Sequence, residues 1–313
     1  MKPLPTMLAS EIPATPPSQN WLIEGLWGAE GIGIVGGEPK TCKSFLALDL
    51  AVSVASGAPC LRRFPTVQRG PVLLFAGEDE VRDVRTRIEG IAAAAGVAFE
   101  GLDVHIITVP ALRLDHDGDR RALDATVAAL RPKLLVLDPF VRLHGIDENV
   151  AGEVAPLLGF LRTLQRTHHT AVTLVHHARK GAAHERGGQA LRGSSEFHAW
   201  GSSNLYMRRI GGERQLSIEH RAAASQDWFP VVFRDNPPAL EVADQQPAAV
   251  TVRPSLQQRI MTILTDAGGP VPQKDIRDRA RMRNGDVSRT LAALVEEGRV
   301  VKSNSGYQLP ASA

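Results

Sequence analysis

The segment Gly37-Glu-Pro-Lys-Thr-Cys-Lys-Ser44 places a glycine, a lysine and a hydroxyl at the spacing of a phosphate-binding loop. Such a loop reads Gly, four residues, then Gly-Lys-Ser/Thr, so Cys42 stands where the second glycine is expected. Lys43 is expected to reach the β- and γ-phosphates of ATP, and Ser44 to ligate Mg²⁺. The alternative is a glycine-rich turn that binds no ligand. The residues expected to contact the nucleotide are Gly37, Glu38, Pro39, Lys40, Thr41, Cys42, Lys43 and Ser44.

The segments on both sides of this loop suit that chemistry. Ile32–Val35 has the apolar run of a buried strand, and Phe45–Val52 that of an apolar helix. Strand, loop and helix in this order aim backbone N–H groups and the positive end of the helix dipole at phosphate.

Cys42 bears on activity more than on fold. If its position requires a positive φ, the side chain costs about 1 kcal/mol, which would weaken binding or slow turnover without abolishing either. A thiol beside Lys43 and a helix N-terminus is also open to oxidation, so a redox switch is one alternative. The other is that Cys42 is a tolerated small residue.

Two carboxylates follow apolar strands at places where phosphate chemistry needs them. Lys133–Asp138 is an apolar strand that ends in Asp138, which we expect to hold the Mg²⁺ shell. Glu78 follows the strand Val72–Ala76 and is expected to orient the attacking water. The alternative is that Glu78 and Asp79 cap the helix that begins near Val81.

A further strand, Thr173–His177, ends in two histidines. A polar residue at this strand end can hydrogen-bond the γ-phosphate, and His177 is the better candidate for such a sensor. A structural histidine pair and a zinc site are the alternatives, although no cysteine or carboxylate stands nearby at ligand spacing.

These motifs together resemble the RecA-like ATPases of the RepA plasmid-helicase type. The resemblance covers residues 21–234 and rests on the phosphate loop and on three further motifs. They read Trp21-Leu-Ile-Glu-Gly-Leu, Asp138-Pro-Phe-Val-Arg-Leu-His-Gly-Ile-Asp-Glu-Asn149 and Val175-His-His-Ala-Arg-Lys180. It implies a RecA core, ATP with Mg²⁺, and a homo-oligomeric ring, usually a hexamer, with sites at subunit interfaces. It also implies Glu78 as catalytic glutamate and His177 as sensor.

The same resemblance implies a positive charge supplied by a neighbouring subunit. Leu216-Ser-Ile-Glu-His-Arg221 is similar to the helicase segment that carries a lysine and an arginine two residues apart. Arg221 fits the arginine, whereas Glu219 replaces the lysine, which puts the strength of activation in doubt. Arg208 and Arg209 are alternative fingers.

Leu191-Arg-Gly-Ser-Ser-Glu-Phe197 resembles a segment that follows the DNA-facing loops in the wider DnaB-like class. The preceding residues 180–188 are glycine-rich and polar, which favours a loop that faces single-stranded DNA in the ring channel. The alternative is a solvated surface. The candidate contacts are Arg179, Lys180, Arg186 and Arg192.

Composition divides the 313 residues into a large and a small domain. Residues 1–20 are proline-rich and predict a flexible lead-in without a secretory signal. Residues 21–234 alternate apolar strands with helical patterns, which predicts an α/β domain with a mostly parallel sheet. Residues 235–254 have the composition of a linker. Two cysteines and no long apolar run predict a cytoplasmic protein without membrane contact.

Residues 255–313 hold nine Lys and Arg against six Asp and Glu, so the net charge of +2 is concentrated there. Their pattern predicts helices at 256–264, 273–280 and 285–297 and a hairpin over 300–309, which resembles a winged helix–turn–helix. Such a unit binds duplex DNA through its third helix and wing, although winged helices also bind proteins. The basic residues expected near the DNA are Arg277, Arg279, Arg281, Arg283, Arg289 and Lys302.

These features predict an ATP-hydrolysing helicase or DNA remodeller that serves replication of a plasmid, phage or other mobile element. The alternatives are an ATP-switched DNA-binding regulator or loader, and a nucleotide-binding protein that Cys42 and Glu219 have deprived of turnover. Glu219 and the appended winged helix favour the regulator over a processive helicase.

Overall fold

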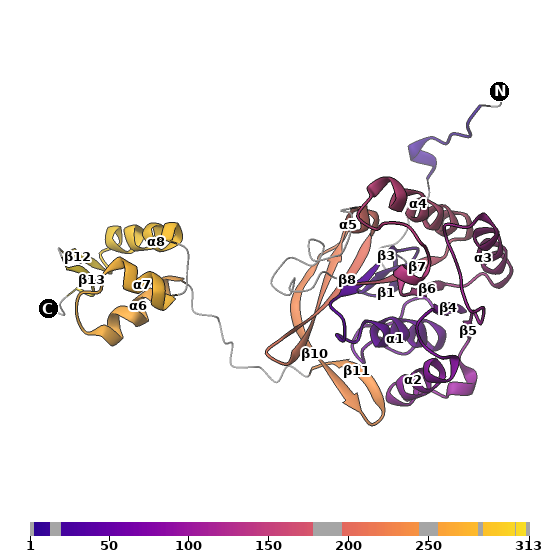
Figure 1. Cartoon of the computed structure of the whole chain (residues 1–313), viewed down its shortest axis with the longest axis horizontal. Coiled ribbons are helices and arrows are strands. Elements are labelled where there is room, and N and C mark those ends of the chain that lie inside the picture. Colours follow the sequence, from indigo (N-terminus) through magenta and orange to yellow (C-terminus); the bar gives the residue numbers. More distant parts are fainter. Residues whose placement is uncertain are drawn as a thin grey trace. The chain divides into compact units, whose positions relative to one another are not determined.

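The structure, a computed structural model, describes residues 3–12, 20–177, 196–243, 256–280, 284–303 and 305–310 (Figure 1). The chain divides into two compact units, Met1–Ala243 and Asp244–Ala313, here called unit 1 and unit 2.

Unit 1 is built on a mostly parallel sheet with strand order β11-β10-β9-β8-β3-β7-β6-β4-β5 over its described residues. The strands are β3 (Ile32–Gly37), β4 (Val72–Ala76), β5 (Val104–Ile106), β6 (Leu134–Asp138), β7 (Ala171–His177), β8 (Ser203–Ile210), β9 (Glu213–His220), β10 (Gln226–Asp235) and β11 (Pro238–Val242). From β8 to β5 all neighbours are parallel, and β9, β10 and β11 extend the sheet antiparallel. The predicted α/β class and mostly parallel sheet are confirmed.

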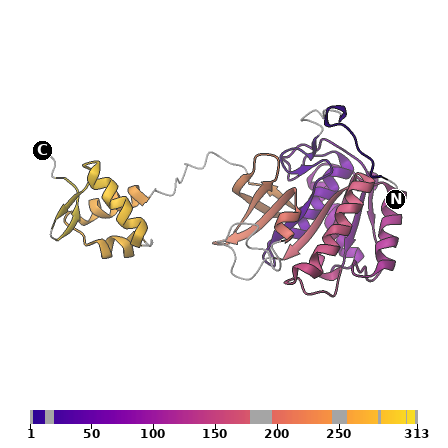
Figure 2. The ribbon, with the colours of Figure 1, turned by 90° about the horizontal axis from the view of Figure 1, so that it is seen from above.

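Helices cover both faces of this sheet (Figure 2). They are α1 (Lys43–Ser56), α2 (Val81–Ala94), α3 (Asp117–Leu130), α4 (Ala151–His168) and α5 (Glu196–Trp200), with short 3₁₀ turns η1 (Ala9–Glu11), η3 (Phe99–Gly101) and η4 (Phe140–Arg142) and a small ribbon of β1 (Trp21–Ile23) and β2 (Trp27–Gly28). Successive strand residues alternate between the two cores, because neighbours in a strand point to opposite faces. In β6, Leu134 and Val136 pack with α1 and α2, whereas Leu135 and Leu137 pack with α3 and α4.

Strand register determines which loops share an edge of the sheet. Gly37 of β3 lies beside His177 of β7 and beside Met207 of β8. The carboxyl ends of these parallel strands therefore form one edge, here called the carboxyl edge. Strand β9 runs back, so His220 lies beside Ser203 at the opposite edge.

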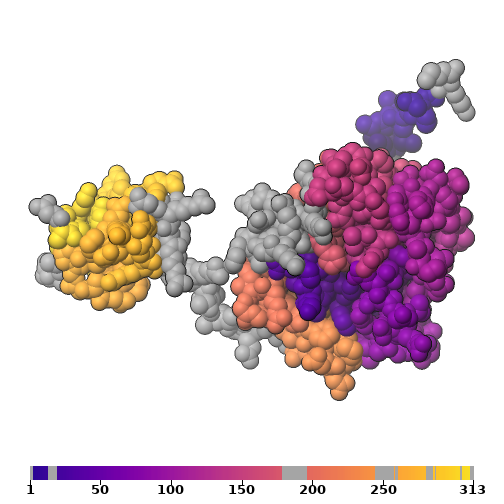
Figure 3. All heavy atoms as spheres, in the orientation of Figure 1, coloured from indigo at the N-terminus to yellow at the C-terminus, as the bar shows by residue number. Residues whose placement is uncertain are grey.

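The sheet extends into the segment that the sequence predicted to be a linker. Strand β11 pairs with β10 across the turn at Asn236 and Pro237, with Ala239 and Leu240 buried. A Cβ added to Gly90 of α2 would lie 2.5 Å from the Pro238 ring, so only a glycine permits this approach. The orange strands accordingly adjoin the purple surface of the helices in the space-filling view (Figure 3). The prolines that suggested a linker form a hairpin turn.

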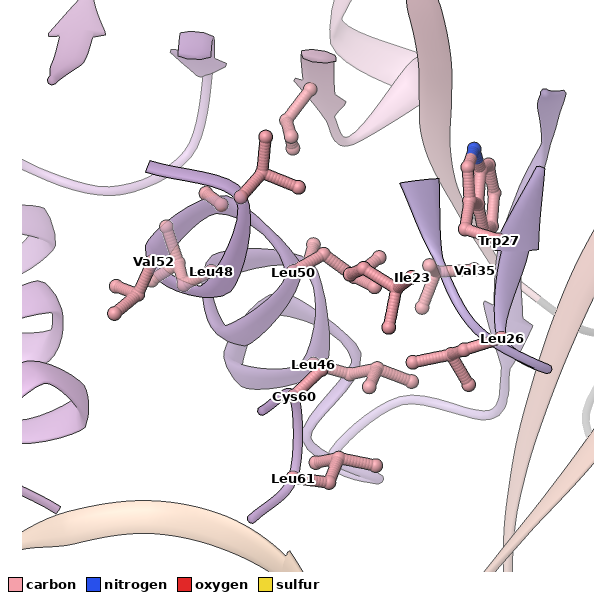
Figure 4. Packing of buried hydrophobic residues seen from close by; sticks show 14 of the residues in the cluster. Ile23, Leu26, Trp27, Val35, Leu46, Leu48, Leu50, Val52, Cys60 and Leu61 are labelled. Carbon is pink, nitrogen blue, oxygen red and sulfur yellow. The ribbon is translucent and has the colours of Figure 1, made fainter. Parts of the chain in front are cut away.

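Helix α1 anchors the phosphate loop to the core. Its side chains are buried on all sides, and Leu46 and Leu50 point toward the ribbon residues Leu26 and Ile23 (Figure 4). A helix that is apolar all round is a core helix, so the loop before it is held by a rigid element.

Unit 2 has three helices and a two-stranded hairpin over its described residues. They are α6 (Leu256–Ala267), α7 (Gln273–Ala280), α8 (Asn284–Glu296), β12 (Val301–Ser303) and β13 (Gly306–Gln308). Val271, between the first two helices, bridges to Tyr307 of the hairpin. The buried core includes Ile260, Ile276 and Leu291, one from each helix.

Among the described residues, no helix is both long and apolar enough to cross a membrane.

Close packing of β3 against β8 gives a test of this fold. A Cβ added to Gly33 would lie 1.7 Å from the Ser203 carbonyl oxygen, so Gly33→Ala should destabilise unit 1 by about 3 kcal/mol in urea unfolding. Gly159→Ala in α4 is the matched control, because nothing lies within 4 Å of its Cβ. It should leave stability equal or raise it, since alanine favours a helix. Equal unfolding midpoints for the two variants would contradict this packing.

Candidate nucleotide site

The phosphate loop of Gly37–Ser44 turns back on itself at the carboxyl edge. Both the Thr41 hydroxyl and the Lys43 ammonium donate to the Glu38 carbonyl oxygen, each at 2.8 Å. A Cβ on Gly37 would lie 2.2 Å from the Met207 carbonyl oxygen, and its φ is +153°, so this position requires glycine. The loop therefore has the narrow backbone path of a phosphate cradle.

Cys42 adopts the conformation for which a glycine is expected at its position. Its φ is +72° and its ψ is 30°, in the left-handed region, immediately before α1 begins at Lys43. Lys40 is also left-handed, with φ +65°. Both side chains carry a conformational cost that glycine would avoid.

Lys43 is buried, with 5% of its surface exposed. Burial lowers the pKa of its ammonium to about 8, against the opposing influence of Asp138, Cys42, Glu78 and Glu38. The group remains mainly cationic at neutral pH. It is thus a desolvated positive charge directed into a site that bears several carboxylates.

Asp138 and Ser44 meet in this site as predicted. The Ser44 hydroxyl hydrogen-bonds the Asp138 carboxylate, and Asp138 is 8% exposed. Burial raises the pKa of Asp138 to about 6, and the nearby Asp79 and Glu78 raise it further against Ser44 and Lys43. A hydroxyl and a carboxylate are oxygen ligands that fit Mg²⁺. Bound Mg²⁺ bridges phosphate oxygens and neutralises charge during phosphoryl transfer.

Glu78 and Asp79 follow β4 at the same edge and have separate partners. Ala76 pairs with Asp138, and the Gly77 N–H donates to the Asp138 carbonyl oxygen at 2.7 Å. Glu78 accepts from Arg142 Nε at 2.9 Å.

Asp79 accepts two bonds from Arg87, at 2.6 and 2.9 Å. The N-cap of α2 is Glu80, without a side-chain cap bond, so the prediction that Asp79 caps this helix is wrong. The long-range arginine competes better for the carboxylate than the local backbone does.

The two histidines of β7 differ because they point to opposite faces. His176 is 1% exposed and stacks on Phe197 with ring centroids 4.3 Å apart, so it is a core residue. His177 is half-buried and lies beside Gly37 in the register, where a sensor is predicted. The described residues hold no group of three or more His, Cys, Asp and Glu suited to a metal ion.

Within one chain, the predicted finger Arg221 does not reach the carboxyl edge. It follows β9 at the opposite edge, where its guanidinium donates to the Ala199 carbonyl. Glu219 lies 3.6 Å from His198 there. Arg208 and Arg209 are on the carboxyl edge, and Arg208 stacks over Trp228 at 3.9 Å.

The predicted DNA-loop residues Arg179, Lys180, Arg186 and Arg192 lie outside the described residues, as do Arg281 and Arg283 of unit 2.

An aromatic and cationic cluster beside the phosphate loop was missed by the sequence. Phe45, directly after Ser44, meets Phe233 of β10 edge to face at 4.7 Å. Arg87 lies over the Phe45 ring at 5.4 Å and Arg214 over the Phe233 ring at 5.8 Å. Phe45 alone carried a signal through its position, whereas Phe233 joins it only through the strand order.

Comparison with known proteins agrees with this fold. A family model described as an AAA domain matches residues 2–183. A solved structure of the ATPase domain of a helicase is similar with TM-score 0.53 and 11% identity, covering 68% of this chain and 85% of that one. At this identity the likeness shows the fold, a RecA-like core. A model for a domain of unknown function, DUF7343, matches residues 254–308.

The left-handed Cys42 gives a test of the loop. Cys42→Gly should stabilise unit 1 by about 1 kcal/mol in thermal unfolding, because glycine removes the steric cost at φ +72°. Cys42→Ala is the matched control, since alanine also has a Cβ and should give no gain. Equal stabilisation by both variants would show that the sulfur, and not the backbone, is responsible.

Proposed function

This chain belongs to the AAA domain family, whose model covers more than half of it, and is a P-loop ATPase; we propose that it hydrolyses ATP to act on DNA as a helicase or remodeller. The proposal includes replication of a plasmid, phage or other mobile element as its setting, in the cytoplasm. Its main support is the gathering of Lys43, Ser44, Asp138 and Glu78 at one edge of the sheet.

In this proposal each residue has one task. Lys43 contacts the β- and γ-phosphates of ATP from its buried position, and Ser44 and Asp138 hold Mg²⁺. Glu78 orients the attacking water and accepts its proton, while His177 contacts the γ-phosphate. The Phe45 and Phe233 rings offer the adenine a stacking surface beside the loop.

The position of Arg221 supports an assembly of several copies. It stands at the edge away from its own phosphate loop, so it can serve only the site of a neighbouring copy. We therefore propose a ring, in which Arg221 supplies the charge that accelerates phosphoryl transfer and single-stranded DNA passes through the channel.

Unit 2 supports contact with duplex DNA. Its three helices, hairpin and Val271–Tyr307 bridge fit a winged helix–turn–helix. In this reading α8 enters a major groove and Lys302 of β12 reaches phosphate. The domain plan proposed is thus a lead-in at 1–20, an ATPase domain from 21 through β11, and a DNA-binding domain at 255–313.

A second candidate function is an ATP-switched regulator or loader without unwinding. Glu219 favours it, because it pairs with His198 where the related helicases carry a lysine. ATP hydrolysis without strand separation would select this candidate.

The proposed hydrolysis is tested by two substitutions. Lys43→Ala should abolish binding of a fluorescent ATP analogue, because the buried ammonium is lost. Glu78→Gln should bind ATP but turn it over about 10²- to 10⁴-fold more slowly, since the amide cannot accept the proton. Lys133→Ala, which changes a lysine at the opposite edge, is the control and should behave as wild type. Normal turnover by Glu78→Gln would exclude Glu78 as the base.

Duplex binding by unit 2 is tested by its salt dependence. Lys302→Ala in the full chain should weaken affinity for duplex DNA and reduce the slope of log affinity against log salt by about 1, because one phosphate contact is lost. Lys133→Ala removes the same charge from unit 1 and should keep the wild-type slope. An unchanged slope in Lys302→Ala would contradict the wing contact.

A further inference from the structure

Arg142 is bound directly to the proposed catalytic glutamate. Its Nε–H donates to Glu78 Oε1 at 2.9 Å, joining η4 to the end of β4 across 64 positions of the chain. We propose that Arg142 is a positioning residue, which fixes the Glu78 carboxylate so that its other oxygen faces the attacking water. This inference rests on the proposed ATP hydrolysis.

The backbone that carries Arg142 is firmly anchored. Phe140, two residues earlier in η4, is fully buried. Its ring lies 4.4 Å from His144 and 5.3 Å from Phe197, centroid to centroid. The Arg142 N–H donates to the Pro139 carbonyl at 3.1 Å, which closes the turn. Arg142 therefore starts from a fixed point, although its side chain is 60% exposed.

Gly77 allows this anchored turn to approach Glu78. A Cβ at Gly77 would lie 2.9 Å from the Phe75 ring and 3.0 Å from Arg142 Cβ. The Gly77 N–H also donates to the carbonyl of Asp138. The residue before Glu78 is thus tied to the Mg²⁺ ligand, and Glu78 itself to Arg142.

The form of the pair leaves Glu78 able to act. Asp79 has both oxygens occupied by Arg87. Glu78, in contrast, uses only Oε1, and Oε2 has no partner in the part of the chain that the structure describes. One oxygen is held and one is available for water. The neighbouring carboxylates Asp79 and Asp138 repel Glu78, and the Arg142 charge offsets this repulsion.

The test separates positioning from a structural role by its kinetics. Arg142→Ala should lower kcat for ATP about 10- to 100-fold while KM stays at the wild-type value, because Glu78 is misplaced and the phosphate cradle is intact. Arg142→Lys should recover most of kcat, since a single contact to Oε1 needs one donor. Exposed ion pairs add little stability, so the melting temperature should not change.

Arg85→Ala is the matched control. Arg85 is equally exposed, at 60%, and pairs with Glu89 at 2.8 Å on α2. Its removal should leave kcat unchanged. A kcat for Arg142→Ala equal to or above that of the wild type would overturn the positioning role and leave the proposed function standing.

Nucleotide affinity provides a readout that needs no turnover. In the Glu78→Gln background, Arg142→Ala should leave the Kd of an N-methylanthraniloyl-ATP analogue unchanged, because Arg142 acts through Glu78. Weaker binding there would mean that Arg142 contacts the nucleotide itself, and would overturn the proposal. Wild-type turnover no greater than that of Lys43→Ala would refute the proposed hydrolysis as well.

Discussion

The burial of one lysine ammonium, that of Lys43, is the constraint on which the rest of unit 1 depends. A desolvated cation is costly unless carboxylates compensate it. The strand order supplies them: β7 lies between β3 and β6, and β4 lies beyond β6, so Asp138 and Glu78 end at the same edge as the phosphate loop. Within the described residues, Arg87 and Arg142 then balance Asp79 and Glu78. The site is a set of opposite charges held by parallel pairing.

The loop that carries Lys43 is held in a costly backbone path by its surroundings. Cys42 and Lys40 are left-handed, and Gly37 touches the backbone of β8. Such conformations persist where the neighbouring structure determines them strongly, and they are frequent at functional sites. Helix α1, buried on all sides, and strand β3, buried at every position, provide that support. Packing far from the phosphates is therefore part of the site.

Local sequence patterns predicted the elements well and the long-range partners poorly. The apolar runs located β3, β4, β6 and β7, and the ends of β6 and β7 located Asp138 and His177. The prolines around Pro237 masked β11, because composition does not show that a proline pair turns a hairpin. Asp79 was taken for a cap because Arg87 and its geometry are not visible in a motif. Arg142 and Phe233 reach the site only through tertiary structure, so no local pattern could have assigned them.

A RecA-like core with a separate basic unit suits a machine in which ATP turnover and DNA contact are coupled. Steady-state ATP hydrolysis by the full chain, measured without DNA, with single-stranded DNA and with duplex DNA, tests that coupling most directly. Stimulation of hydrolysis by single-stranded DNA is the predicted result. A rate that is measurable but the same with every DNA would contradict it.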